Sequence, residues 1–322
     1  MAKYKELINM PALKAFQDSA PRVSRQFNDA AYGVVLARNL EAVDPQVFMV
    51  KYPQLTFMNS GVAIDNTGGY SETIKSLRVR DQGEFRNAGD KSSNKGIISV
   101  AGDYSSLQVK EREAESEYSN TEIEQAKLQN YNLVNGILGA HAKVYQQEID
   151  RSGYTGIKDI SSSEGLLNYS SFSSTSATGA VASLTPKQLY DDIAGLIRLQ
   201  HSAVNNVPEY MADKVSLPLN VANYMNGIYD DTSGRSVMDM LRQNFAGVDF
   251  IFTQYGTTDF LTTSAGCAWS SNTEAMKYRL PLPLTVGEVI KTGSFKFKVE
   301  SKYRTAGLDI LEDTAGYILT GL

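Results

Sequence analysis

The residues that could carry out chemistry are few and lie far apart in this sequence. Neither His141 nor His201 has a cysteine or a carboxylate at the spacing of a metal-ligand set. The pairs Asp191–Asp192 and Asp230–Asp231 are adjacent carboxylates; neighbouring side chains on a helix diverge, and the second pair, near Gly234, is typical of a turn. No nucleophile elbow, phosphate-binding loop or dinucleotide-binding turn occurs. We therefore predict no catalytic, cofactor-binding or metal site, and no enzyme.

A division of charge is the stronger chemical pattern. Glutamates occupy every second position from residue 111 to residue 117, and a strand would place them in one row on one face. Exposed ion pairs contribute only about 0–1 kcal/mol each, so a solvated face and a docking surface are both open interpretations. In the docking interpretation, the residues that contact a neighbouring subunit are Arg78, Arg80, Arg86, Glu111, Glu113, Glu115 and Glu117.

The stretch that positions these charges, residues 61–118, is punctuated by glycines between short alternating runs. Alternation is typical of strands and glycine of turns, so we expect a long β-hairpin with an irregular tip. Its outgoing limb would be basic and its returning limb acidic. Because a loop of more than about 15 residues is unusual in a compact domain, we expect this hairpin to lie on another chain.

A long helix should follow. Ser119-Asn-Thr-Glu122 is a capping box, and apolar residues then recur at helical spacing until Gly153, which would end the helix. Gly136 and Gly139 lie inside this helix, where each costs up to about 1 kcal/mol against alanine. They predict either a close crossing or a bend, and bending would be easiest there.

The remaining segments predict a mixed architecture. Four prolines break residues 1–60 into short pieces without a core of their own, while the serine- and threonine-rich residues 161–183 indicate an exposed loop. A second capped helix starts at Thr185 and another at Ser236. Strands are expected near Val215–Leu219, in Val248–Tyr255, and at several places after Cys267. Helices and strands without regular βαβ spacing indicate the α+β class.

Composition limits the classes of function. The chain has 322 residues, 42% of them hydrophobic, and a net charge of −5. This charge and the lack of a basic cluster argue against specific DNA or RNA binding. The single cysteine excludes an intrachain disulfide, and no apolar run approaches the roughly 20 residues of a membrane span. We therefore expect no membrane partner.

The order of these segments resembles the tailed-bacteriophage major capsid proteins of the Hong Kong 97 type. The resemblance covers nearly the whole chain, and its force lies in the order of diffuse signatures. These signatures are Leu40–Asp44 and Lys51–Leu55 for the end of an arm, Glu117–Ala126 for the entry to a spine helix, Gly153–Gly156 with Gly165–Asn168 for its exit, and Val299–Gly307 with Tyr317–Leu322 for closing strands.

The resemblance implies an N-terminal arm (1–60), an extended β-hairpin loop (61–118), a spine helix and peripheral domain (119–155, completed by 290–322) and an axial domain (156–289). It also implies pentamers and hexamers of an icosahedral head around double-stranded DNA, assembled in the host cytoplasm. Expected partners are further copies of the chain, a separate scaffolding protein, a portal and a decoration protein, with packaged DNA contacted non-specifically. Encapsulin nanocompartments share this fold and are the near alternative; a cytosolic α+β enzyme using carboxylates is the distant one.

Some members of the fold join a loop lysine to an asparagine of a neighbouring subunit. Lys91 and Lys95 lie where such a lysine could sit, but no motif identifies its partner. Lysines at loop tips are usually solvated, so we do not predict a crosslink.

Overall fold

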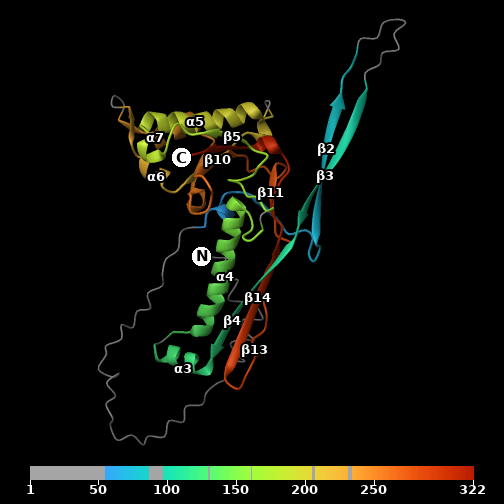
Figure 1. The fold of residues 1–322 in the computed structure, drawn as a ribbon, viewed down its shortest axis with the longest axis vertical. Coiled ribbons are helices and arrows are strands. Elements are labelled where there is room, and N and C mark those ends of the chain that lie inside the picture. The colour runs from blue at the N-terminus through green and yellow to red at the C-terminus, as the bar shows by residue number, and fades with distance from the viewer. Residues whose placement is uncertain (1–54, 87–96, 130, 161, 205–206, 231–233) are drawn as a thin grey trace, which may run out of the picture. The chain divides into compact units, whose positions relative to one another are not determined.

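The computed structural model describes residues 55–86, 97–129, 131–160, 162–204, 207–230 and 234–322 (Figure 1). The chain divides into two compact units. Among the described residues, unit 1 contains those within Arg112–Val144 and Leu284–Tyr303, and unit 2 contains those within Pro53–Glu111, Tyr145–Pro283 and Arg304–Leu322. Residues 1–54 of the expected arm lie outside the described residues, as do Lys91 and Lys95.

A five-stranded sheet forms the centre of unit 2, and its order is β5–β16–β10–β6–β9. These strands span Ser173–Ser176, Gly316–Thr320, Ala265–Trp269, Lys214–Pro218 and Asp249–Thr253. Helices α5 (Pro186–Ala203), α6 (Val221–Tyr224) and α7 (Val237–Asn244) accompany the sheet, as does the short pair β7 (Ile228–Asp230) and β8 (Arg235–Ser236) (Figure 1). The mixed helix and sheet confirm the expected α+β class.

The core of this sheet follows the apolar patterns of the sequence. Thr185 accepts from the Gln188 amide and Gln188 reaches back, which confirms the predicted capping box of α5. The apolar stripe of α5 is fully buried and packs against β10 and β16, as expected of an amphipathic helix. Its buried members are Leu189, Ile193, Leu196 and Ile197.

One expectation about this unit is wrong. Within the expected loop 161–183, Ser173–Ser176 forms β5, because its backbone pairs in parallel with β16. Strand β16, at the end of the expected closing segment 290–322, lies between β5 and β10 in this sheet. Ile318 and Leu319 are both buried, and successive strand residues face opposite sides, so β16 needs a sheet position that is covered on both faces.

Unit 2 also contains a three-stranded sheet and the hairpin. The sheet consists of β1 (Ala63–Asp65), β11 (Met276–Arg279) and β15 (Gly307–Ile310). The hairpin pairs β2 (Thr73–Gly83) with β3 (Ile98–Gln108) in an unbroken antiparallel register from Thr73↔Gln108 to Gly83↔Ile98. The expected long β-hairpin is therefore present, with strands that end at Gln108.

Unit 1 is built on a second sheet. Strand β14 (Lys296–Thr305) pairs with β12 (Leu282–Val286), β13 (Ile290–Lys291) and β4 (Lys110–Ser119). Tyr118 at the end of β4 is buried, and its ring stacks on Phe297 with centroids 5.6 Å apart. Because β4 pairs with β14 and not with β2, the expected acidic returning limb of the hairpin is wrong: the glutamates belong to a different sheet.

The long helix begins at the predicted residue but is divided. Ser119 and Glu122 form the capping box of α3 (Asn120–Leu128), as predicted. The helix is interrupted after Leu128, and a second helix, α4, spans Leu133–Thr155. Asn132 caps its start, because the Asn132 side chain accepts a hydrogen bond from the Asn135 amide at 3.2 Å. The expectation of a single helix of about thirty residues is therefore wrong.

The glycines of α4 have distinct roles. A Cβ at Gly136 would lie 1.9 Å from the Tyr131 hydroxyl, so this glycine allows a close approach, whereas a Cβ at Gly139 would meet no atom within 4 Å in the described structure. Gly153 does not end the helix, which continues to Thr155; it leaves room for the ring of Phe57, which lies where a Cβ would be. The stop is Gly156, whose φ of +87° favours glycine.

Candidate functional site

The predicted contact arginines have different surroundings on β2 and beyond it. The Arg78 guanidinium donates to the Ile310 carbonyl and lies 3.6 Å from Asp313, so much of its polar capacity is used within the chain. The backbone of Arg80 pairs with Ala101, and its side chain lies outside the described part of the structure. Arg86 is exposed and pairs with Glu84 at 2.6 Å. These arginines therefore do not form one basic face.

The four glutamates do share one face, as strand periodicity predicts. All four are exposed along β4, and they alternate with residues that are mostly less exposed. Glu115 pairs with Lys298 at 2.5 Å, and Glu111 lies 3.3 Å from Arg304. In the described residues, Glu113 and Glu117 have no ion-pair partner. The row is therefore half neutralised within its own chain.

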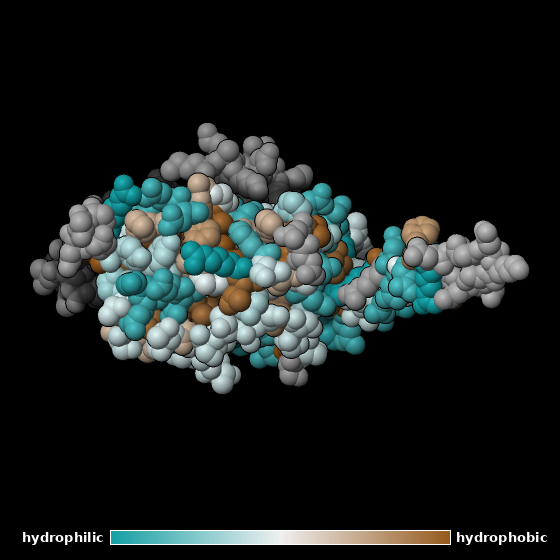
Figure 2. Space-filling view, turned by 90° about the horizontal axis from the view of Figure 1, so that it is seen from above, coloured by the Kyte–Doolittle hydropathy of each residue, from teal (hydrophilic) through white to brown (hydrophobic). Residues whose placement is uncertain are grey.

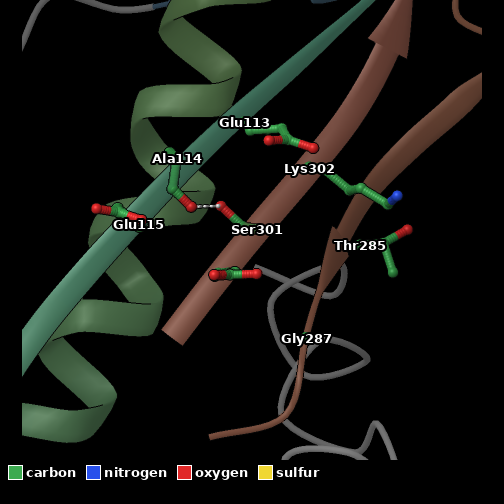
Figure 3. A pocket seen from close by; sticks show the side chains of 8 residues that line it. Glu113, Ala114, Glu115, Thr285, Gly287, Ser301 and Lys302 are labelled. Carbon is green, nitrogen blue, oxygen red and sulfur yellow. Dashed lines mark hydrogen bonds between the residues drawn. The ribbon is translucent and has the colours of Figure 1, made fainter. Parts of the chain in front are cut away.

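Lys298 connects this row to β14. It contacts Glu115 and also Glu300, the latter at 3.0 Å, and hydrogen bonds to these two carboxylates raise the pKa of the Lys298 ammonium. A groove of about 390 Å³ lies beside them in unit 1 and is lined by β4, β12 and β14 (Figure 3). Figure 3 shows Glu113 and Glu115 on β4 and Lys302 on β14 at this groove. The groove is lined by both acidic and basic side chains, among them Glu113, Glu300 and Lys302.

His141 is the histidine of α4, and it is buried between β4 and β14. Its Nε2 lies 2.8 Å from the Ser116 hydroxyl and its Nδ1 lies 2.6 Å from the Ser301 hydroxyl. Burial lowers the pKa of the imidazole, which favours the neutral ring that donates at one nitrogen and accepts at the other. Both ring nitrogens are thus used to hold the helix against two strands of the sheet.

The base of the hairpin is anchored by a buried ionic cluster in unit 2. Arg279 of β11 lies between Asp65 of β1 and Asp309 of β15, and it donates to Ser76 of β2 at 2.9 Å. Ser76 in turn donates to Asp309 at 2.8 Å. Only 10% of the Arg279 side chain and 1% of the Asp309 side chain are exposed. The hairpin is therefore held at its base by charge-assisted hydrogen bonds.

The two faces of the hairpin differ in polarity. Residues directly opposite each other in the register share a face, so one face carries Leu77 with Tyr104 and Val79 with Gly102. This face continues to Val100 and Ile98, and its five large apolar side chains are 54–68% exposed. We call it the apolar face; its large apolar residues are Leu77, Val79, Ile98, Val100 and Tyr104. The same face also carries Lys75 opposite Ser106 and Asp81 opposite Val100. The other, polar face carries Ser76, Arg78, Gln82, Ser99, Ala101 and Asp103, with Ile74 opposite Leu107 near its base.

Sequence reasoning missed the apolar face, although its signal was present. Leu77 and Val79 alternate with charged residues in β2, and Ile98 and Val100 alternate with small residues in β3. The prediction of contact residues rested on the arginines instead, and Arg78 lies on the face that packs against the hairpin's own unit. The register, which brings the two apolar sets together, cannot be derived from either strand alone.

A buried carboxyl joins the start of the described chain to α4. Asp150 is 1% exposed and accepts from the Phe57 amide at 2.5 Å. Burial raises the pKa of Asp150 to about 6, although this hydrogen bond and one from the Thr56 backbone act in the opposite direction. The Phe57 ring packs edge-on against Tyr154 and Tyr278 with centroids 5.4 and 5.5 Å away. Residues 56 and 57 are thus fixed to the helix.

The described residues contain neither a metal-ligand cluster nor a helix that could cross a membrane. No group of three or more histidine, cysteine, aspartate or glutamate side chains is placed to hold a metal ion within those ranges. Within the same ranges, no helix combines the length and apolar character that a membrane crossing requires. The lone Cys267 is buried, and burial raises the pKa of its thiol.

Comparisons with known proteins identify the class. A family model described as major capsid protein matches residues 89–321, more than half of the chain. The capsid of Myoviridae Phage XM1 is 39% identical, with 90% of this chain and 99% of that chain covered and a TM-score of 0.82. A comparison with curated proteins finds no match. The chain therefore belongs to the major capsid protein family.

More distant structures share the fold. The capsid of a native GTA particle, computed with C5 symmetry, has a TM-score of 0.64 at 11% identity, and 90% of this chain and 99% of that chain are covered. A chain of Mycobacterium phage Adephagia has the same TM-score at 15% identity, with coverage of 90% and 98%. These matches agree with the Hong Kong 97 type fold expected from the sequence, which is confirmed.

Proposed function

We propose that copies of this chain assemble into the pentamers and hexamers of an icosahedral phage head that encloses double-stranded DNA. The observation that carries the proposal is the 39% identity, over 90% of the chain, to the capsid of Myoviridae Phage XM1. A structural role in the virion, without catalysis, is part of the proposal. The buried position of His141 supports it, because both of its ring nitrogens are engaged by Ser116 and Ser301 in holding α4 against the sheet.

The hairpin supports assembly from repeated subunits. A closed shell needs heterologous contacts that repeat around its rings, and an extension can reach a neighbour that a compact surface cannot. Each strand of the hairpin has 11 residues, or roughly 37 Å at about 3.4 Å per residue. All seven predicted residues stay candidates for contacts between subunits, including Arg80, Glu113 and Glu117. Four of them, Arg78, Arg86, Glu111 and Glu115, also have partners in their own chain.

The remaining expectations become part of this proposal. The division into arm, extended loop, spine helix with peripheral domain, and axial domain stays a prediction. Assembly in the host cytoplasm, a separate scaffolding protein, a portal and a decoration protein are proposed from the family. The net charge of −5 suits a container that contacts its DNA non-specifically, because a strongly basic inner wall would hinder release.

Expression of the full chain alone tests the proposal. We expect size-exclusion chromatography and negative-stain microscopy to show rings or closed shells at tens of micromolar chain, since assembly depends on concentration. A persistent 35.3 kDa monomer under these conditions would count strongly against assembly. In particles from infected cells, packaged double-stranded DNA separates a phage head from an encapsulin-like nanocompartment, which would hold protein cargo instead.

A further inference from the structure

The carboxyl of Asp150 lies in an environment that is unusual for an acidic side chain. Teal and pale residues, which are hydrophilic or of intermediate hydropathy, cover most of the coloured surface in Figure 2. Asp150 by contrast is 1% exposed, and no cation of the described residues pairs with it. Acidic side chains are almost never fully buried unless they are paired. A carboxyl in such a place is a candidate for a proton-dependent role.

Three phenols surround this carboxyl and the Phe57 ring next to it. Tyr154 of α4 and Tyr255 act on Asp150 electrostatically, and Tyr278 of β11 packs on the Phe57 ring. Burial raises the pKa of all three phenols, so each is neutral in mildly acidic and neutral solution. They therefore add no charge that could compensate the carboxylate.

The charged groups of α4 that lie beside Asp150 in the chain have other neighbours. The Arg151 guanidinium lies over the ring of Phe260, 5.7 Å from its centroid. Glu148 acts on Tyr278, and as a second carboxylate it could not compensate the first. Residues 55–60 contain no ionisable side chain. Protonation of the carboxyl is therefore the way in which this site loses its buried charge.

Residues 55–60, which we call segment 55–60, are attached to α4 at this carboxyl. The Phe57 amide donates to Asp150 at 2.5 Å, the Thr56 hydroxyl donates to the Tyr154 hydroxyl at 3.0 Å, and the Phe57 ring packs on Tyr154. Within the described structure, the backbone–backbone hydrogen bonds of the segment are the two that close its own turn, 3.2 and 3.0 Å long. The segment can therefore detach while α4 and the sheets stay folded.

We propose that Asp150 is a proton-dependent clamp for segment 55–60, which is held to α4 while the carboxyl carries a proton and detaches locally as the proton leaves. The neutral carboxyl still accepts from the Phe57 amide through its carbonyl oxygen. Residues 1–54 precede the segment in the chain, so detachment changes the point at which they are tethered. The clamp works within one chain and does not depend on the proposed assembly.

The direction of the pH dependence follows from burial. Burial raises the pKa of Asp150 from 3.8 to about 6 in the attached state, although backbone hydrogen bonds act in the opposite direction. Detachment returns the carboxyl to water, so the attached state binds more protons between these two values. The equilibrium constant for detachment should therefore rise with pH, by about fiftyfold between pH 4 and pH 7.

Hydrogen exchange followed by mass spectrometry tests the proposal on the full chain, at concentrations below assembly. Dividing the intrinsic rate by the measured rate at pH 4, 5, 6 and 7 gives a protection factor for peptides that cover segment 55–60. We expect this factor to fall about fiftyfold from pH 4 to pH 7, and to stay well below that of peptides around the buried Ile149 at every pH. Equal protection of segment 55–60 and Ile149 would show that the segment opens only when the whole chain unfolds, which would overturn the proposal.

Two variants separate the proton from the attachment. Asp150→Asn keeps an oxygen that can accept from the Phe57 amide but cannot titrate, so protection of the segment should no longer depend on pH. Thr56→Val removes the donor to Tyr154 and should lower protection by about three- to tenfold at every pH, with the pH dependence unchanged. Asp249→Asn, at a carboxyl that is 74% exposed, should change neither.

The outcomes are decisive even if one variant fails to fold. A pH dependence that persists in Asp150→Asn would assign the effect to another group and overturn the proposal. If Asp150→Asn does not fold, the unmodified chain and Thr56→Val decide: protection independent of pH in both overturns the clamp, and the expected fall in both supports it. Assembly into shells is not measured in any of these experiments, so the clamp and the proposed function can fail separately.

Discussion

Arg279 shows how one buried cation fixes the base of an extension. It lies between Asp65 and Asp309, and its removal would leave the almost fully buried Asp309 without a cation. Because an uncompensated buried charge is costly, we expect Arg279→Met to lower the free energy of unfolding by about 3–5 kcal/mol. Urea unfolding at chain concentrations below assembly measures this change.

An exposed arginine provides the control. Arg86 and Glu84 form an ion pair whose side chains are 51% and 65% exposed, so Arg86→Gln should change the free energy of unfolding by no more than about 1 kcal/mol. A loss below about 1 kcal/mol for Arg279→Met as well would contradict the role of Arg279 as the cation that compensates the buried Asp309.

Asp150 should make stability depend on pH in the mildly acidic range. Its pKa is about 6 in the folded chain, against an ordinary value of 3.8, so the folded state binds more protons between these values. Stability therefore falls as pH rises from about 4 to about 6, by about 3 kcal/mol at most. Asp150→Asn should remove this decline, which urea unfolding at pH 4, 5, 6 and 7 would measure.

The comparison needs a carboxyl that is exposed. Asp249 has a side chain that is 74% exposed and pairs with Lys214, so Asp249→Asn tests the effect of deleting one surface carboxylate. We expect this variant to keep the pH dependence of the unmodified chain. An unchanged decline in Asp150→Asn would assign the pH dependence to other groups.

At the scale of the element, two glycines of α4 form a matched pair. A Cβ at Gly153 would lie 2.5 Å from the Phe57 ring, whereas a Cβ at Gly139 would meet nothing within 4 Å in the described structure. We expect Gly153→Ala to destabilise by about 1–3 kcal/mol through overpacking. Gly139→Ala should stabilise by up to about 1 kcal/mol through helix propensity. Thermal unfolding followed by circular dichroism compares them; equal effects of the two substitutions would contradict the packing role of Gly153.

Elements with local signals could be predicted from the sequence, and elements set by pairing could not. Ser119 and Thr185 begin helices because their capping boxes are contained within four residues. The partner of β4 depends instead on β14, far along the chain, so the glutamate row was predicted but its sheet was not. Asn132 is a residue type that favours the start of a helix, so the sequence contained a local signal for the start of α4. The apolar residues at helical spacing continue across the break between α3 and α4, and they favoured one continuous helix. No local pattern indicated that Arg279 joins three strands.

At the scale of the whole molecule, the hairpin combines a fixed base with an uncovered outer part. The base is held by Ser76, Arg78 and Arg279, and the exposed apolar side chains begin at Leu77 and continue to Ile98. Deletion of residues 65–108 would therefore remove both the docking surface and partners of the ionic cluster. A sharper deletion must cut beyond Arg78, so that loss of assembly is separated from loss of folding.

Val79 and Gly102 are directly paired, so residues 80–101 can be replaced by Asn-Gly, which favours a two-residue hairpin turn. The shortened chain keeps Ser76, Arg78 and Asp103, and we expect thermal unfolding within a few degrees of that of the full chain. It should nevertheless form no closed shells in negative stain at concentrations where the full chain assembles, because Ile98 and Val100 are removed. Normal shells from this variant would show that the outer hairpin is dispensable and that subunits associate through other surfaces.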